Sequence, residues 1–219
     1  MKRGILQGAM TLILLGASGR LSAATTFEQQ VLVALNAARA NPIAYAKSLQ
    51  QYRTYFRANI LRYPGQEAEV ETQEGVKVVD ETIAFLANRA SLQPIQASPL
   101  LGSAAMDLVL DQSATGNTGH EGGDGGSPSD RARRHGGGSY VAEVIAYGPI
   151  DASDVVRQLI VDDGVADRGH RSILYSPDLR FAGVACGPHP EYRVMCVIDL
   201  AATADGNVPG GSSARTVAR

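Results

Sequence analysis

The sequence predicts an α/β fold in which helices pack on both faces of a mixed sheet. Three observations support this class. Helical patterns fill the N-terminal half, one apolar strand follows at residues 140–147, and two strand-like runs come last, at residues 181–186 and 192–200. A further helical pattern, residues 153–162, separates the first strand from the last two. Helices that precede and also interrupt the strands favour layers on both sides of one sheet.

Residues 1–24 have the three parts of a secretory signal peptide. Lys2 and Arg3 form a positive start, residues 5–16 are mostly apolar, and residues 22–24 offer small side chains for a cut after Ala24. A membrane-spanning helix needs about 20 apolar residues, and this run is shorter. We therefore expect no membrane anchor and predict a secreted or periplasmic protein, with both compartments left open.

The N-terminal half of the mature chain is predicted to be largely helical. Residues 26–49 repeat apolar side chains at three- and four-residue spacing, Thr26 is a suitable N-cap, and Pro42 is expected to kink or restart the helix. Residues 80–90 and 100–113 show the same pattern. Residues 52–77 lie between the first helical pattern and the second and are polar and weakly patterned. We interpret this segment as an insertion, such as a lid or flap.

The second half begins with a loop and continues with strands. Residues 115–126 are rich in glycine and are expected to be irregular. Ser129 and Asp130 are predicted to cap a short helix that ends at residues 136–138. Residues 140–147 are apolar at nearly every position, which is typical of a strand buried on both faces.

The two last strands carry the only two cysteines, Cys186 and Cys196. In an exported protein a lone pair of cysteines favours a disulfide. The bond would link the two strands of a hairpin and contribute roughly 3 kcal/mol on the loop-entropy estimate. Residues 25–201 are thus predicted to form one domain, and residues 202–219, which are small and polar, a flexible tail.

The charge of the chain argues against a nucleic-acid partner. Loss of the three basic residues of the signal peptide changes the formal charge from −2 to −5. A mildly acidic protein lacks the positive surface that binds nucleic acid. The one basic run, Arg131, Arg133 and Arg134, is interpreted as a solvated helix turn rather than a binding patch.

Four polar residues lie in surroundings that favour a functional site: His120, Glu143, Asp162 and His170. Glu143 interrupts an apolar strand, where a carboxylate is costly unless it is paired or binds a metal. His120 lies in the glycine-rich loop, and Asp162 lies on or near the buried stripe of its helix. Taken singly, each of the four also fits a structural role, because no local metal motif such as HExxH is present.

Several segments match a known family in the family's own order: residues 35–39 with Asn41 and Pro42, Gly119 and His120, residues 142–148, and residues 169–174. Together they resemble the CAP superfamily of SCP-like extracellular domains, which includes cysteine-rich secretory proteins, antigen 5 and pathogenesis-related 1 proteins, in its bacterial form. The resemblance implies an α-β-α sandwich with a central mixed, largely antiparallel sheet. It also implies a central cleft lined by His120, Glu143, Asp162 and His170.

The chain departs from the family pattern at three positions. Leu159 stands where the helix usually has tryptophan, and Val144 stands where asparagine usually follows the glutamate. Asp162 replaces the usual glutamate of the helix, which shortens its reach by one methylene. The neighbouring Asp163 is therefore an alternative fourth residue of the cleft.

Two imidazoles with carboxylates suit a divalent transition metal, zinc most plausibly, and the four residues are predicted as its ligands. A zinc-bound water with Glu143 as ligand or base would make the protein a metal-dependent hydrolase. The family has no shared reaction, and fold does not fix function. We therefore favour a secreted binding module that engages a hydrophobic small molecule, a cell-wall component or a protein. A structural scaffold without metal is the third alternative.

Overall fold

The structure is a computed structural model that describes residues 25–149 and 151–210. The predicted signal peptide and the last nine residues of the predicted tail lie outside the described residues. No helix in the described ranges is long and apolar enough to cross a membrane.

The centre of the molecule is a four-stranded sheet in the order β4-β6-β7-β5. The strands are β4 (Gln96–Ala97), β5 (Ala142–Tyr147), β6 (Phe181–His189) and β7 (Arg193–Ala201). β4 runs parallel to β6, and the other neighbours are antiparallel. The predicted mixed, largely antiparallel sheet is confirmed, with β4 inside the segment expected only to be extended.

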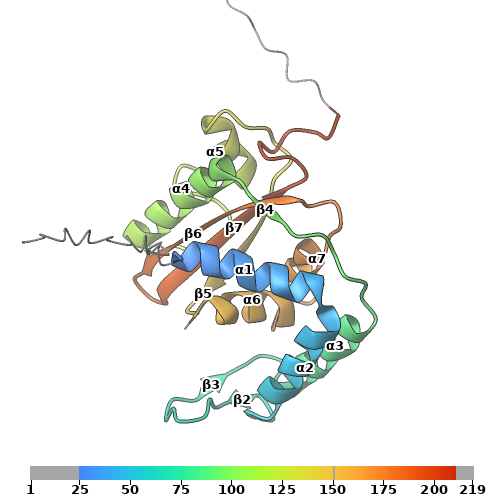
Figure 1. Cartoon of the computed structure of the whole chain (residues 1–219). Coiled ribbons are helices and arrows are strands. Elements are labelled where there is room, and N and C mark those ends of the chain that lie inside the picture. Colours follow the sequence, from blue (N-terminus) through green and yellow to red (C-terminus); the bar gives the residue numbers. More distant parts are fainter. Residues whose placement is uncertain (1–24, 150, 211–219) are drawn as a thin grey trace, which may run out of the picture.

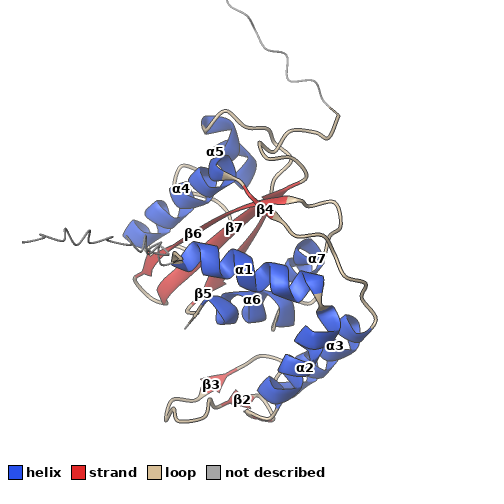
Figure 2. Ribbon diagram, in the orientation of Figure 1, coloured by secondary structure: helices blue, strands red, loops and turns tan. Residues whose placement is uncertain are grey.

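Helices cover both faces of this sheet (Figures 1 and 2). One face carries α4 (Pro99–Thr115) and α5 (Pro128–Arg134). The other carries α1 (Phe27–Ala40), α6 (Ala152–Val161) and α7 (Gly169–Leu174). The α-β-α sandwich implied by the family resemblance is confirmed.

The alternation of β5 divides its side chains between the two layers. Val144 and Ala146 belong to the core under α1 and α6, whereas Ile145 and Tyr147 pack in the core under α4. Glu143 has the same parity as Ile145 and Tyr147, so it faces the α4 layer. The strand is buried on both faces, as its apolar composition predicts.

The expected break at Asn41–Pro42 divides the first helix into α1 and α2 (Pro42–Arg53). Asn41 ends α1 and caps α2, because its side-chain oxygen accepts a hydrogen bond from the Ala44 amide at 3.0 Å. Thr26 forms a capping box with Gln29, which confirms it as the N-cap of α1. The start of the chain's first helical unit was thus correctly predicted.

The starts of α5 and α6 differ from the prediction because an earlier side chain accepts the free amide hydrogens. Ser127, not Ser129, caps α5, and α6, expected to begin at residue 153, begins at Ala152 with Asp151 as its cap. Helix α3 (Val76–Ala87) starts four residues earlier than expected. The short helix α7 was not predicted.

Residues 54–75 form an arm between α2 and α3. The arm contains three two-residue strands, β1 (Phe56–Arg57), β2 (Ile60–Leu61) and β3 (Val70–Glu71), paired antiparallel in that order. Figure 1 shows the arm below β5 and α6. The segment interpreted as a lid or flap therefore has regular structure of its own.

The C-terminal hairpin is cross-linked as predicted by a disulfide between Cys186 and Cys196. The two residues are direct partners in the β6–β7 register, with Cα atoms 4.1 Å apart. The residues directly after β7, which were predicted to begin a flexible tail, are held against the body of the protein. Carbonyls of Asp205 and Gly206 accept hydrogen bonds from the amides of Gly138 and Tyr140, which docks the start of the predicted tail onto the body.

Candidate functional site

The structure brings the two predicted site histidines together. His120 lies in the loop after α4 and His170 lies in α7, so they come from layers on opposite faces of the sheet. Their ring centroids are 6.5 Å apart and the rings are tilted by 44°. Glu143, which bonds His120, belongs to β5, the edge strand of the sheet. The site therefore lies where the two helix layers meet beside that edge.

The first histidine is paired with the glutamate. His120 Nδ1 lies 2.9 Å from Glu143 Oε1, and the Glu143 side chain is only 1% exposed. The other oxygen of Glu143 accepts a hydrogen bond from Arg131 of α5. Arg131 also donates to the carbonyls of His120 and Gly126 at 3.0 and 2.9 Å. One buried guanidinium thus fixes both the carboxylate and the loop that carries the histidine.

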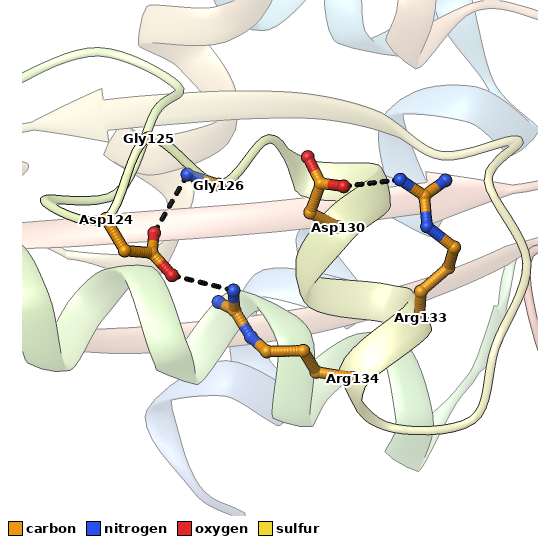
Figure 3. A pocket seen from close by; sticks show the side chains of 6 residues that line it. All are labelled: Asp124, Gly125, Gly126, Asp130, Arg133 and Arg134. Carbon is orange, nitrogen blue, oxygen red and sulfur yellow. Dashed lines mark hydrogen bonds and ion pairs between the residues drawn. The ribbon is translucent and has the colours of Figure 1, made fainter.

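This role of Arg131 corrects the interpretation of the basic run as a solvated helix turn. Arg131 faces the sheet and its side chain is 1% exposed. The interpretation holds for Arg133 and Arg134, which are exposed and pair with Asp130 and Asp124 beside a hollow of about 590 Å³ (Figure 3). The sequence showed three arginines in one turn, but the helix buries only the one on its inner face.

A second buried acid lies next to Glu143. Asp199 of β7 is its direct partner in the β5–β7 register and is fully buried. In the described part of the chain no donor group hydrogen-bonds to either oxygen of Asp199. Burial, followed by the charge of Glu143, raises the pKa of Asp199 well above its ordinary value. The raised pKa favours the protonated form of Asp199 beside the carboxylate of Glu143.

Sequence reasoning missed Asp199. The signal was the one that identified Glu143, namely a lone acid inside an apolar strand. The pairing of the two acids depends on strand register, which the sequence pattern did not supply.

The second histidine is paired with the aspartate. His170 Nδ1 lies 2.7 Å from Asp162 Oδ1, and the backbone amide of Arg171 donates to Asp162 Oδ2 at 3.1 Å. Asp162 is the C-cap of α6 and adopts the left-handed conformation, with φ of 62°. The left-handed turn ends α6 and carries the carboxylate to the start of α7.

A comparison with known protein families identifies the family of the chain. The family model described as CAP, the cysteine-rich secretory protein family, matches residues 34–200. The chain belongs to the CAP family. No curated protein matches the chain.

Two solved structures are similar to this CAP domain. One is an extracellular protein containing an SCP domain from Bacillus anthracis strain Ames, at 15% identity and a TM-score of 0.43. The other is an outer surface protein from Borrelia burgdorferi, at 14% identity and a TM-score of 0.41. Each match covers 57% of this chain. The matched region is 37% of the Bacillus protein and 85% of the Borrelia protein.

In this CAP domain Asp162, not Asp163, contacts a site histidine. Asp163 turns towards the arm, where its two oxygens accept hydrogen bonds from the amides of Gln73 and Glu74 at 2.7 and 2.8 Å. The alternative that Asp163 substitutes for Asp162 is therefore not supported. Of these adjacent acids, Asp162 therefore bonds the site histidine and Asp163 holds the arm.

The arginine after His170 anchors α7. Arg171 is buried and donates to the carbonyls of Ile160 and Val161 and to the hydroxyl of Thr82, each at 2.7 Å. It also pairs with Glu81 at 2.7 Å. The Gly-His-Arg segment of this CAP domain thus places the histidine through the contacts of the next residue.

The donor atoms fit a two-histidine metal site better than a four-ligand site. Carboxylates that bond Nδ1 of a histidine commonly orient it for metal binding through its other nitrogen. No hydrogen bond within the described ranges uses Nε2 of His120 or His170. Nor do those ranges contain a group of three or more His, Cys, Asp or Glu side chains arranged to hold a metal. Direct ligation by Glu143 and Asp162 remains a prediction, and the geometry favours an orienting role for both.

Proposed function

We propose that this protein is an exported binding module whose cleft holds a divalent transition metal, with zinc as the expected ion, through His120 and His170. The observation that carries the proposal is the pairing of each imidazole Nδ1 with a buried carboxylate. Such pairing fixes the tautomer and the orientation of the imidazole for a metal at Nε2. Water would complete the shell of the metal, which would serve as a Lewis acid at the cleft.

Two further features support export. Residues 1–24 have the composition of a signal peptide, and a disulfide joins Cys186 to Cys196. Disulfides persist in oxidising compartments, and the matching family is one of secretory proteins. The ligand of the module is proposed to be a hydrophobic small molecule, a cell-wall component or a protein.

The metal-dependent hydrolase is less well supported by the geometry. Glu143 would have to act as the base, yet its two oxygens contact His120 and Arg131 and its side chain is 1% exposed. A general base must reach the water that it deprotonates. A substrate that wild type turns over and Glu143→Ala does not would nevertheless establish the hydrolase.

Calorimetric titration of the metal-stripped mature protein with zinc tests the metal site. The variants are His120→Ala/His170→Ala and, as the control, His135→Ala. His135 also bonds a carboxylate, with its Nε2 3.0 Å from Asp107, but it lies outside the site. We expect one zinc per wild-type chain, the same in His135→Ala, and none in the double variant.

The other outcomes have definite meanings. Equal zinc binding by wild type and the double variant would place the metal elsewhere and overturn the proposed site. Absence of zinc binding by a well-folded wild type would rule out the proposed metal site. A structural role would then be the better description of the four residues.

A further inference from the structure

A second cavity lies between the arm and the body, with a volume of about 350 Å³. Its apolar and aromatic walls combine residues that are far apart in the sequence: Tyr52, Leu61, Tyr63, Val70, Tyr147 and Val161. We propose that this cavity binds a small, neutral, aromatic molecule. The proposal needs no metal and is independent of the function proposed for the two histidines.

The size of the cavity limits the ligand. Small-molecule sites in proteins usually have volumes of about 300–1,000 Å³, so this cavity is near the lower end of that range. Its occupant would be a molecule of about two or three rings.

Two tyrosines give the cavity its chemical character. The rings of Tyr52 and Tyr63 lie 6.2 Å apart and are tilted by 39°. Tyr147 borders the cavity at the end of β5, but its ring packs on the α4 side of the sheet. Aromatic pairs favour offset or edge-to-face contacts at centroid distances of 4.5–7 Å. A planar aromatic ligand would make the same contacts with these rings.

The charges around the cavity favour a neutral ligand. Arg157 pairs with Asp154 at 2.6 Å and lies over the ring of Tyr52, 4.7 Å from its centroid. The protein's own guanidinium thus occupies the face where a cationic ligand would bind. The carboxylates of Glu71 and Asp163 also line the cavity, and they would repel an anion.

The arm is attached to the body at both ends of the cavity. Arg157 donates to the hydroxyl of Tyr63 at 2.9 Å, and Asp163 accepts the amides of Gln73 and Glu74. A cavity whose walls are already fixed loses little conformational freedom when a ligand binds. The docked arm therefore makes this a preformed site.

Two related fluorescent probes test the proposal on the metal-stripped mature protein. N-phenyl-1-naphthylamine is neutral, and 8-anilinonaphthalene-1-sulfonate is the same arylamine with a sulfonate. We expect saturable binding of the neutral probe with a Kd of order 10 μM, and binding of the anion at least tenfold weaker. Equal or tighter binding of the anion, or no saturation by the neutral probe, would overturn the proposal.

Substitutions at the cavity mouth locate the bound probe. Val70 is 49% exposed, so Val70→Glu adds a charge to the cavity without burying it in the core. We expect at least tenfold weaker binding, against less than twofold for Val70→Ala. Leu110→Glu is the matched control, because Leu110 is 63% exposed on α4, away from this cavity, and this variant should bind as wild type does.

Amide chemical shifts of the wild type provide a readout that does not depend on how the variants fold. The neutral probe should shift the amides of Val70, Gly148 and Val161, which surround the cavity. Shifts confined to other regions, or equal affinity in Val70→Glu and Leu110→Glu, would show binding elsewhere. The zinc titration is unaffected by either result, so failure of one proposal does not imply failure of the other.

Discussion

The two histidine–acid pairs make the same hydrogen bond but are built differently. The His120–Glu143 pair joins a loop to a strand 23 residues away and is supported by Arg131. The His170–Asp162 pair spans only eight residues and is supported by a backbone amide. The imidazole of His120 is 49% exposed and that of His170 is 25% exposed.

The difference shows two ways of keeping a carboxylate buried behind a histidine. Glu143 lies in the core and needs a full opposite charge, which Arg131 supplies, and its own charge helps to raise the pKa of its neighbour Asp199. Asp162 lies at a helix end and needs only the amide of Arg171. The first pair should therefore depend strongly on distant side chains, and the second mainly on local backbone.

Removal of the guanidinium should have the largest effect. Arg131→Met leaves the buried Glu143 charge without its partner, and breaking a buried ion pair typically costs about 3–5 kcal/mol. Urea unfolding measures the loss. The control is Arg133→Met, because that exposed pair with Asp130 should contribute no more than about 1 kcal/mol. Equal losses in the two variants would mean that the first pair does not depend on buried charge.

A second substitution sharpens this result. Arg131→Met/Glu143→Leu removes both charges, and apolar residues of similar volume often replace a buried ion pair without loss of stability. We expect the double variant to recover most of the stability that the single variant loses. Its zinc affinity should still fall, because His120 then lacks its orienting carboxylate.

The raised pKa of Asp199, which lies behind the first pair, should be visible as a pH dependence of stability. The raised pKa of Asp199 means that the folded state binds a proton that the unfolded state releases above about 3.8. The contribution of Asp199 to stability should then fall with pH, by up to about 1.36 kcal/mol per unit, from that value until the folded-state pKa is reached.

Asp199→Asn keeps the shape of the protonated acid but cannot titrate. Its stability should lack this slope, so its stability relative to wild type should rise with pH by up to about 1.36 kcal/mol per unit. Unfolding free energies measured between pH 4 and 7 provide the comparison. Parallel pH profiles for the two proteins would show that Asp199 is ionised in the fold.

Substitution of the acid in the second pair should cost less stability than removal of Arg131 from the first. Asp162→Asn retains a residue that tolerates the left-handed conformation, but a single amide oxygen replaces the two that bond His170 and Arg171. We expect a loss of about 1–2 kcal/mol in unfolding free energy and a 10- to 100-fold weaker zinc affinity. Asp167→Asn, at an exposed acid nearby that accepts the Gly169 amide, should change neither quantity appreciably.

Local patterns in the sequence were sufficient for much of this architecture. Apolar spacing and the Asn41–Pro42 break predicted α1 and α2, continuous apolar residues predicted β5, and the lone cysteines predicted the disulfide. These features depend on neighbours in the chain. The four site residues emerged together only through the family motifs, because single polar residues have several structural explanations.

The missed features depend on contacts between distant segments. Which arginine of α5 faces inward depends on how that helix packs on the sheet, and the Glu143–Asp199 pairing depends on strand register. The arm is polar and weakly patterned, and its position depends on Asp163 of the body. A one-dimensional pattern carries none of this information.

The smallest effect is expected at Glu81, an exposed residue that bonds Arg168 and Arg171 on either side of His170. Glu81 accepts hydrogen bonds from Arg168 and then Arg171, which lower its pKa to about 2 from an ordinary value of 4.5. A lowered pKa adds stability above pH 4.5 that is lost as the pH falls towards 2. The Glu81 side chain is 48% exposed, so Glu81→Gln should cost less than about 1 kcal/mol at pH 6, and the difference should vanish near pH 2. Thermal unfolding across that range measures it, with Glu67→Gln as an exposed control. A difference that persists at pH 2 would mean that packing, not charge, holds this side of α7, and the contrast between the two pairs would then rest on Arg131 alone.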